Sequence, residues 1–274
     1  MSLVKIDENG KGGFACSKSI DLEIGCKNSC VGCYGSKTTY MSEGYFTNIK
    51  AKEYDEKKFR ASCRLTYNKG FRHIRFSKHS DSSSSHLLEN FKSVLKITGE
   101  EGLRLVVVSK SLTYDEEVNQ LLKDGNHTLH ISLGMITKAP SDMDRKRVWM
   151  RYNGPMDIHS VNACLRLVAD VTKPCEEHVG RFHSYMADPK APNFGGTFHD
   201  KYIITPMRYA SKAIAEQYGT DLSKYKYENG YYRPQEVHES WDVFKNWCGE
   251  VGGEVKCCKC LVKEDRYELS KAQA

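Results

Sequence analysis

The chain has 274 residues, of which 39% are hydrophobic and 28% charged, and its formal net charge is +6. This length suits one large domain, because single β/α barrels commonly fill about 250 residues. The longest apolar runs, such as LRLVVV at 103–108, are too short to cross a bilayer, so we expect no membrane-spanning segment and no membrane partner.

The N-terminal stretch MSLVKIDENGKGG lacks the basic start and apolar core of a secretory signal, and we therefore expect a cytoplasmic protein. The chain contains eleven cysteines. In a reducing compartment such thiols stay available for metal ions rather than forming disulfides. Most of them gather in two short segments, which favours metal binding.

Six strand-like runs recur along the chain, with amphipathic helices between them. Strands are predicted at 19–25, 71–77, 103–109, 128–133, 163–171 and 201–205, and helices near 53–68, 85–99, 113–123, 142–152 and 207–218. This βα alternation predicts an α/β fold with a parallel sheet and right-handed crossovers. A doubly wound open sheet is the alternative to a barrel-like arrangement.

The first predicted strand leads into the segment IGCKNSCVGCYG, where Cys26, Cys30 and Cys33 form a C-x3-C-x2-C array. Structural zinc sites and electron-transfer clusters usually have four protein ligands, whereas a catalytic metal centre keeps one position open. No fourth cysteine is close by, and Gly25 permits a tight turn before the array. The pattern indicates a catalytic iron–sulfur site; a zinc knuckle or a disulfide pair is the alternative.

With the aromatic Tyr34 directly after the last cysteine, the array resembles the signature of the radical S-adenosylmethionine superfamily. The resemblance implies a partial (β/α)6 barrel whose cysteines hold a [4Fe-4S] cluster. The remaining iron would bind the amino and carboxylate groups of S-adenosylmethionine, and an electron would then cleave it to methionine and a 5′-deoxyadenosyl radical that takes hydrogen from a substrate. The expected partner is a low-potential electron donor, flavodoxin or ferredoxin.

Chemistry in β/α barrels sits at the carboxyl ends of the strands, so the residues just after each strand are candidates. Ser80 and Asp81 follow the second strand, and their oxygens suit a ligand ammonium; the rest of this serine run, 82–85, is typical of a linker. Lys110 follows the third strand and Ser132 lies late in the fourth, where a cation and a hydroxyl suit a carboxylate or ribose. With Tyr34, these residues resemble the cosubstrate-binding set of the spore photoproduct lyase branch.

The sequence differs at two places from the superfamily that it resembles. The glycine-glycine-glutamate motif of most members is absent from the second strand. Lys78 and His79 stand where the lyase keeps a hydrogen-donating cysteine, so reversal of thymine dimers by that step is not implied. In the fifth strand, Arg166 is a candidate contact for ribose or a substrate carboxylate; an ion pair with Asp21 or Glu23 is the alternative.

The tail WCGEVGGEVKCCKC carries four more thiols, Cys248, Cys257, Cys258 and Cys260. Glycines at 249, 252 and 253 permit a hairpin, and the cysteine count predicts a second metal site, either zinc or iron–sulfur. Reduced surface thiols are the alternative. We therefore divide the chain into a barrel domain at 1–220 and a cysteine-rich extension at 221–274.

Basic residues occur together with aromatic ones in DRKRVWMRY at 144–152, and tyrosines surround an expected Asn-Gly turn at 225–234. The first pattern fits a nucleic-acid face as well as an ordinary amphipathic helix. We expect a nucleic acid or nucleotide as substrate; a peptide or protein is the alternative. A contrasting hypothesis is a non-enzymatic iron–sulfur redox sensor that binds nucleic acid.

Overall fold

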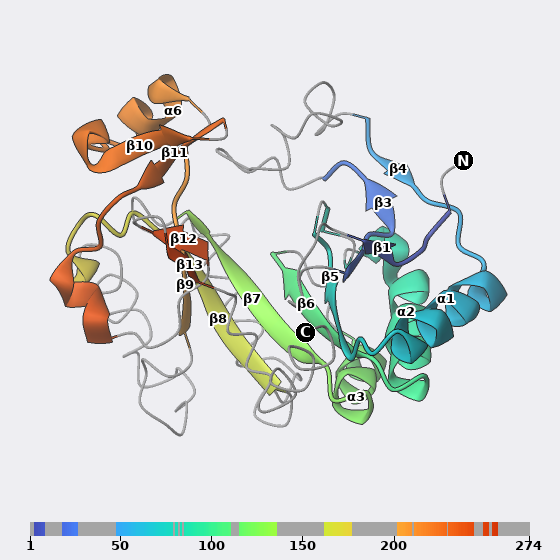
Figure 1. Ribbon diagram of the computed structural model, residues 1–274. Helices are drawn as coiled ribbons and strands as arrows, with labels where there is room; N and C mark the ends of the chain where they lie inside the picture. Colours follow the sequence, from blue (N-terminus) through green and yellow to red (C-terminus); the bar gives the residue numbers. More distant parts are fainter. Residues whose placement is uncertain are drawn as a thin grey trace.

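The computed structural model describes residues 3–8, 18–26, 48–78, 80–81, 83, 85–110, 115–135, 162–176, 202–209, 211–228, 230–243, 249–251 and 254–256. Its centre is a seven-stranded sheet in the order β1-β2-β5-β6-β7-β8-β9 (Figure 1). These strands are β1 (Asp7–Glu8), β2 (Lys18–Ile20), β5 (His73–Phe76), β6 (Arg104–Ser109), β7 (Thr128–Met135), β8 (Asn162–Ala169) and β9 (Tyr202–Pro206). Strand β1 is antiparallel to β2, and all the others run parallel to one another.

The predicted α/β fold with a parallel sheet is confirmed, and five of the six predicted strands have their counterpart in the sheet. The first prediction, 19–25, is correct only in part: β2 ends at Ile20, and Glu23–Ile24 form the short strand β3, which pairs with β4 in a separate sheet. From β2 to β9 each strand lies beside the previous parallel one, and the order never reverses. A doubly wound sheet contains such a reversal, and the order of the described strands does not show one. Within the described ranges, no pairing joins β9 to β1 or β2, and the sheet is open.

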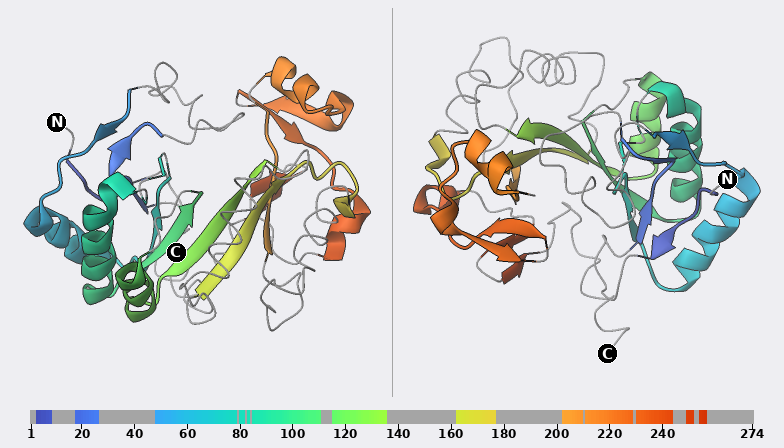
Figure 2. Two further views of the ribbon diagram at one scale, coloured as in Figure 1. Left: turned by 180° about the vertical axis from the view of Figure 1, so that it is seen from behind. Right: turned by 90° about the horizontal axis from the view of Figure 1, so that it is seen from above.

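Three helices cover one side of the sheet beside β5 and β6, as two views show (Figures 1 and 2). They are α1 (Glu56–Asn68), α2 (Leu88–Glu100), which follows the 3₁₀ helix η3 (Ser85–Leu87), and α3 (Glu116–Asp124). A shorter helix, α6 (Lys212–Gln217), follows β9. These elements confirm four of the predicted helices; the fifth, at 142–152, lies outside the described residues.

One face of the sheet is apolar, and the other combines polar residues with apolar ones such as Val106, Val108 and Ile203. The helices pack on its apolar face, to which Ile20, Ile74, Phe76, Leu105, Val107, Leu129, Leu167 and Ile204 contribute. The strand registers place the alternate residues on the opposite face, among them Ser19, Arg75, Thr128, His130, Ser132 and Arg166. We call this second surface the polar face. Because the helices occupy the other side, the polar face is where a ligand site can form.

A buried histidine joins helix α2 to strand β6. His127 Nδ1 accepts a hydrogen bond from the backbone N–H of Leu105 at 2.9 Å, and Nε2 donates to the carbonyl oxygen of Leu95 at 2.9 Å. The ring packs so closely on Gly125 that a Cβ there would overlap it. Burial lowers the pKa of His127 to about 4, so the imidazole is neutral in the folded protein.

This histidine should make the protein sensitive to mild acid. In the unfolded chain His127 takes up a proton near its ordinary pKa of 6.5, while the folded protein resists protonation until about pH 4. Protons therefore favour unfolding as the pH falls through this window, and the free energy of unfolding should drop by about 3 kcal/mol from this group. Urea denaturation at several pH values between 7 and 4.5 measures the drop. His127→Gln should flatten the slope, and an unchanged slope in that variant would contradict the assignment.

The C-terminal elements lie beside β8 and β9 (Figure 1). They are η6 (Leu222–Lys224), the hairpin of β10 (Tyr225–Glu228) and β11 (Tyr231–Pro234), η7 (Glu239–Val243), and the hairpin of β12 (Gly249–Val251) and β13 (Glu254–Lys256). Trp241 of η7 belongs to the main hydrophobic core. The expected turn at 229–230 and the expected hairpin in the tail are both confirmed. Met207, Tyr209, Ala215 and Tyr225 share one apolar cluster across the proposed boundary at 220, which stays a prediction.

In the described part of the chain, no helix has the length and apolar character needed to cross a membrane.

Candidate functional site

The predicted cluster loop begins at the carboxyl end of the first parallel strand. Directly after β2, the short strand β3 (Glu23–Ile24) pairs with β4 (Lys50–Ala51) and leads into Cys26. Gly25 has a φ of 85°, the left-handed turn expected before the array, and Cys26 is buried. Cys30, Cys33 and Tyr34 lie outside the described residues, as do the four cysteines of the tail. Both metal sites therefore stay predictions, and the described ranges hold no group of three metal-binding side chains.

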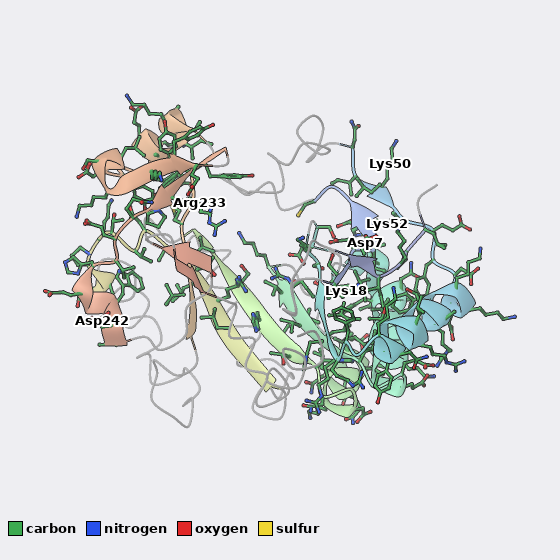
Figure 3. All side chains as sticks on the ribbon, viewed as in Figure 1. Asp7, Lys18, Lys50, Lys52, Arg233 and Asp242 are labelled. Atoms are coloured by element: carbon green, nitrogen blue, oxygen red, sulfur yellow. The ribbon has the colours of Figure 1, made fainter. Side chains whose placement is uncertain are left out.

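Ion pairs and backbone contacts tie this region to the sheet edge. The backbone N–H of Lys52, just after β4, donates to the carbonyl oxygen of Leu22 at 2.8 Å. Its Nζ also lies 3.8 Å from Asp7 Oδ2 on β1. Figure 3 shows Asp7, Lys18 and Lys52 grouped at this edge, with Arg233 of β11 on the far side of the molecule. Lys52 thus contacts both the residue before β3 and the edge strand β1.

Asp81 joins the ends of strands β5 and β6. Its Oδ1 accepts hydrogen bonds from the hydroxyls of Ser109 at 2.7 Å and Ser83 at 3.0 Å. Its Oδ2 accepts from the backbone N–H of Lys110 at 2.8 Å. The two serine hydroxyl oxygens lie 2.6 Å apart, so the single hydroxyl hydrogen of Ser83 is shared between Asp81 and Ser109. The structure therefore brings together two predicted site residues, Asp81 and Lys110.

The linker interpretation of the serine run is wrong for Ser83. Its side chain is fully buried, because its hydroxyl completes the shell of the Asp81 carboxylate. Ser109 was also missed, although its place at the end of β6, directly before Lys110, was a usable signal. A buried carboxylate needs donors from nearby hydroxyls, and a serine-rich loop beside it supplies them.

Ser80 turns the other way, toward the first parallel strand. Its hydroxyl donates to Asp21 Oδ1 at 2.9 Å, and Asp21 is buried just after β2. Before it, Ser77 has a φ of 59°, and its N–H donates to the carbonyl oxygen of Ile20 at 2.9 Å. A left-handed serine costs about 1–3 kcal/mol and is found mainly where function fixes the backbone. Asp21, Ser80 and Asp81 thus link three adjacent strand ends.

Ser132 and Arg166 lie side by side on the polar face. They are partners in the β7–β8 register, and the pairing of Ser109 with Ile131 brings Lys110 level with Ser132. An Arg166 guanidinium N–H donates to His130 Nδ1 at 3.4 Å, and both residues are buried. His130 was missed by the sequence analysis. The role of Arg166 as a contact for ribose or a substrate carboxylate stays a prediction. Glu23, its alternative ion-pair partner, has its Oε2 3.0 Å from Nε2 of His86.

A second buried carboxylate, Asp170, holds the C-terminal hairpin at the end of β8. Its Oδ1 accepts from Tyr225 Oη at 2.6 Å and from Thr172 Oγ1 at 2.7 Å, and its Oδ2 accepts from Thr220 Oγ1 at 3.2 Å. Thr220 Oγ1 also bonds Tyr209 Oη, at 2.6 Å. Burial and the charge of Asp170 raise the pKa of Tyr225. The phenol therefore stays protonated and donates a hydrogen bond to Asp170. The network attaches the hairpin to the sheet.

Asp170→Ala should loosen this hairpin selectively. The buried hydroxyls of Tyr225 and Thr220 would lose their acceptor, at a cost of about 2–4 kcal/mol. Amide hydrogen exchange should then speed up at 225–234 while helices α1 and α2 keep their protection. Asp221→Ala, which removes an exposed carboxylate that accepts from Ser223, is the matched control and should leave exchange at 225–234 unchanged. Equal exchange in both variants would refute the anchoring role.

Comparison of the sequence with protein-family models and with curated proteins gave no match, so the site is defined by the residues of this chain alone.

Proposed function

We propose that this protein is a radical S-adenosylmethionine enzyme that cleaves S-adenosylmethionine reductively. One observation carries the proposal: the C-x3-C-x2-C array begins with a buried cysteine at the carboxyl end of the first parallel strand, and oxygen-bearing side chains lie at the next strand ends. The order of the parallel strands, which never reverses, supports a partial (β/α)6 barrel. The polar face would then line its interior.

The described residues suit the groups that this chemistry requires. Ser80 donates its hydroxyl hydrogen to Asp21, and a hydroxyl oxygen of this kind can also accept a hydrogen bond from a ligand ammonium. Lys110 and Ser132 stand level in the register and match a carboxylate. When bound, a [4Fe-4S] cluster supplies the electron that breaks the sulfonium bond.

The other side chains position these contacts. Asp81 fixes the backbone of Lys110, and Ser83 and Ser109 in turn fix the Asp81 carboxylate. Arg166 and His130, on the neighbouring strands β8 and β7, are hydrogen-bonded to each other and form a buried polar surface. A surface of this kind orients a ligand and limits access of water to reactive species.

The same proposal includes an electron donor, flavodoxin or ferredoxin, and a nucleic acid or nucleotide as substrate. The positive net charge of +6 and the lyase-like set of side chains support that substrate class. The tail cysteines would hold a second metal site, and the protein would work in the cytoplasm.

Anoxic product analysis tests the proposal. Purified protein, reconstituted with iron and sulfide, is mixed with S-adenosylmethionine and dithionite, and products are separated by liquid chromatography. We expect 5′-deoxyadenosine and methionine only when both reagents are present. An iron-loaded protein that forms neither product would contradict the proposal and favour the redox-sensor hypothesis.

A further inference from the structure

The polar face carries an excess of positive charge. The six parallel strands contain no aspartate or glutamate, but they carry three arginines, all on this face: Arg75, Arg104 and Arg166. Cations that are partly buried need a compensating negative charge nearby. The six parallel strands do not supply it. Among the described strands of the sheet, carboxylates lie on the edge strand β1, where Asp7 is the register partner of Ser19 and is within ion-pair distance of Lys5 and Lys52.

Arg75 is the cation on this face for which a compensating negative charge is most clearly missing among the described residues. Its side chain is half-buried in the middle of the sheet, and its Nε is buried without a hydrogen-bonding partner. No ion pair involves Arg75 within the part of the chain that the structure describes. The hydroxyl of Thr205, on the same face of β9, is likewise buried without a partner. Unsatisfied buried groups in a folded protein call for a bound water or ion.

The surroundings of Arg75 suit an oxyanion. Ser19 lies opposite it on β2, and Val106 and Thr128 continue the same row across β6 and β7. The row therefore offers a guanidinium fork with the hydroxyl of Ser19 on the neighbouring strand and that of Thr128 two strands away. Such a fork matches the two oxygens of a carboxylate or phosphoryl group.

We propose that Arg75 binds an oxyanion, a phosphoryl or carboxylate group of a small ligand, on the polar face of the sheet. The site is distinct from the one proposed for S-adenosylmethionine. Val106 is the register partner of Arg75, and Lys110 comes four residues later on the same chain segment. Along the strand direction, Arg75 and Lys110 are therefore about 13 Å apart. The ligand would be the anionic end of a substrate or a separate anion.

Anion binding to the full-length chain tests this site, and the measurement needs neither an iron–sulfur cluster nor S-adenosylmethionine. A negative result would therefore count against the Arg75 site and not against the proposed enzyme activity. The probes are inorganic phosphate, a nucleoside 5′-monophosphate and succinate, each titrated calorimetrically at constant ionic strength. We expect saturable binding of at least one probe, weakened tenfold or more in Arg75→Met and less in Arg75→Lys. Binding of phosphate alone identifies a free anion, and binding of the nucleotide or succinate alone identifies the acid group of a larger ligand.

The stability of the ligand-free variants supplies a second readout. Removing a half-buried cation that has no ion-pair partner among the described residues should leave the melting temperature of Arg75→Met unchanged or higher. The control is Arg64→Met, since Arg64 lies on the exposed side of α1 with its Nε 2.9 Å from Glu101; it should bind the probes like the wild type. Two results overturn the proposal: probe binding that does not depend on Arg75, or a ligand-free Arg75→Met protein that unfolds.

Discussion

Replacing Cys30 by alanine is expected to abolish the formation of 5′-deoxyadenosine, with a loss of about a thousandfold or more. The array supplies only three cysteines, and no other cysteine lies within nine residues of it on either side. The variant would keep two ligands, too few to hold a catalytic cluster. Product analysis by liquid chromatography, together with the iron content of the anoxically purified protein, measures the effect.

Cys63→Ala is the matched control. Cys63 packs in the core beside α1, where burial raises the pKa of its thiol to about 12, so it stays protonated and is a poor metal ligand. The control variant should lose some stability and retain both iron and product. Wild-type product formation by Cys30→Ala would show that the array does not hold the catalytic metal.

Asp81→Ala should reduce both stability and activity. The substitution removes the acceptor for the hydroxyls of Ser83 and Ser109 and for the N–H of Lys110. The serine hydroxyls can still bond each other, but the Lys110 N–H loses its partner, and the expected cost is about 2–4 kcal/mol. Freed from Asp81, Lys110 should no longer be positioned for a carboxylate. We expect weaker binding of S-adenosylmethionine in addition to the drop in the free energy of unfolding.

Asp55→Ala separates the two effects. Asp55 caps helix α1 by accepting from the N–H of Lys58, away from the strand ends, so its loss should lower stability without changing affinity. Urea denaturation and equilibrium dialysis with labelled S-adenosylmethionine measure the two quantities. If Asp81→Ala binds the ligand as tightly as Asp55→Ala does, the positioning role of Asp81 is wrong.

The strands could be predicted from sequence because each parallel strand buries one apolar face. Runs such as LRLVVVS at 103–109 match strand β6 within one residue, since branched apolar side chains favour strands. The turn between β10 and β11 followed from its Asn-Gly pair, and Gly230 has a φ of 83°. Local chemistry determines these features, and they are therefore readable in the sequence.

The contacts between strand ends could not be predicted in the same way. Whether Ser80 meets Asp21 or a ligand depends on how the loop after β5 crosses the first strand, and periodicity contains no such information. The serine run resembled a linker because composition does not distinguish an exposed serine from Ser83, which is buried against Asp81. Likewise, Asp170 and Tyr225 lie far apart in sequence and meet only through tertiary packing.

Electron paramagnetic resonance of the reduced, anoxically purified protein tests the central claim most directly, because a three-cysteine site leaves one iron free to bind S-adenosylmethionine. We predict a [4Fe-4S]⁺ signal that changes when S-adenosylmethionine is added and that disappears when Cys26, Cys30 and Cys33 are all replaced by alanine. Iron-free protein, or a cluster signal that S-adenosylmethionine leaves unchanged, would contradict the account.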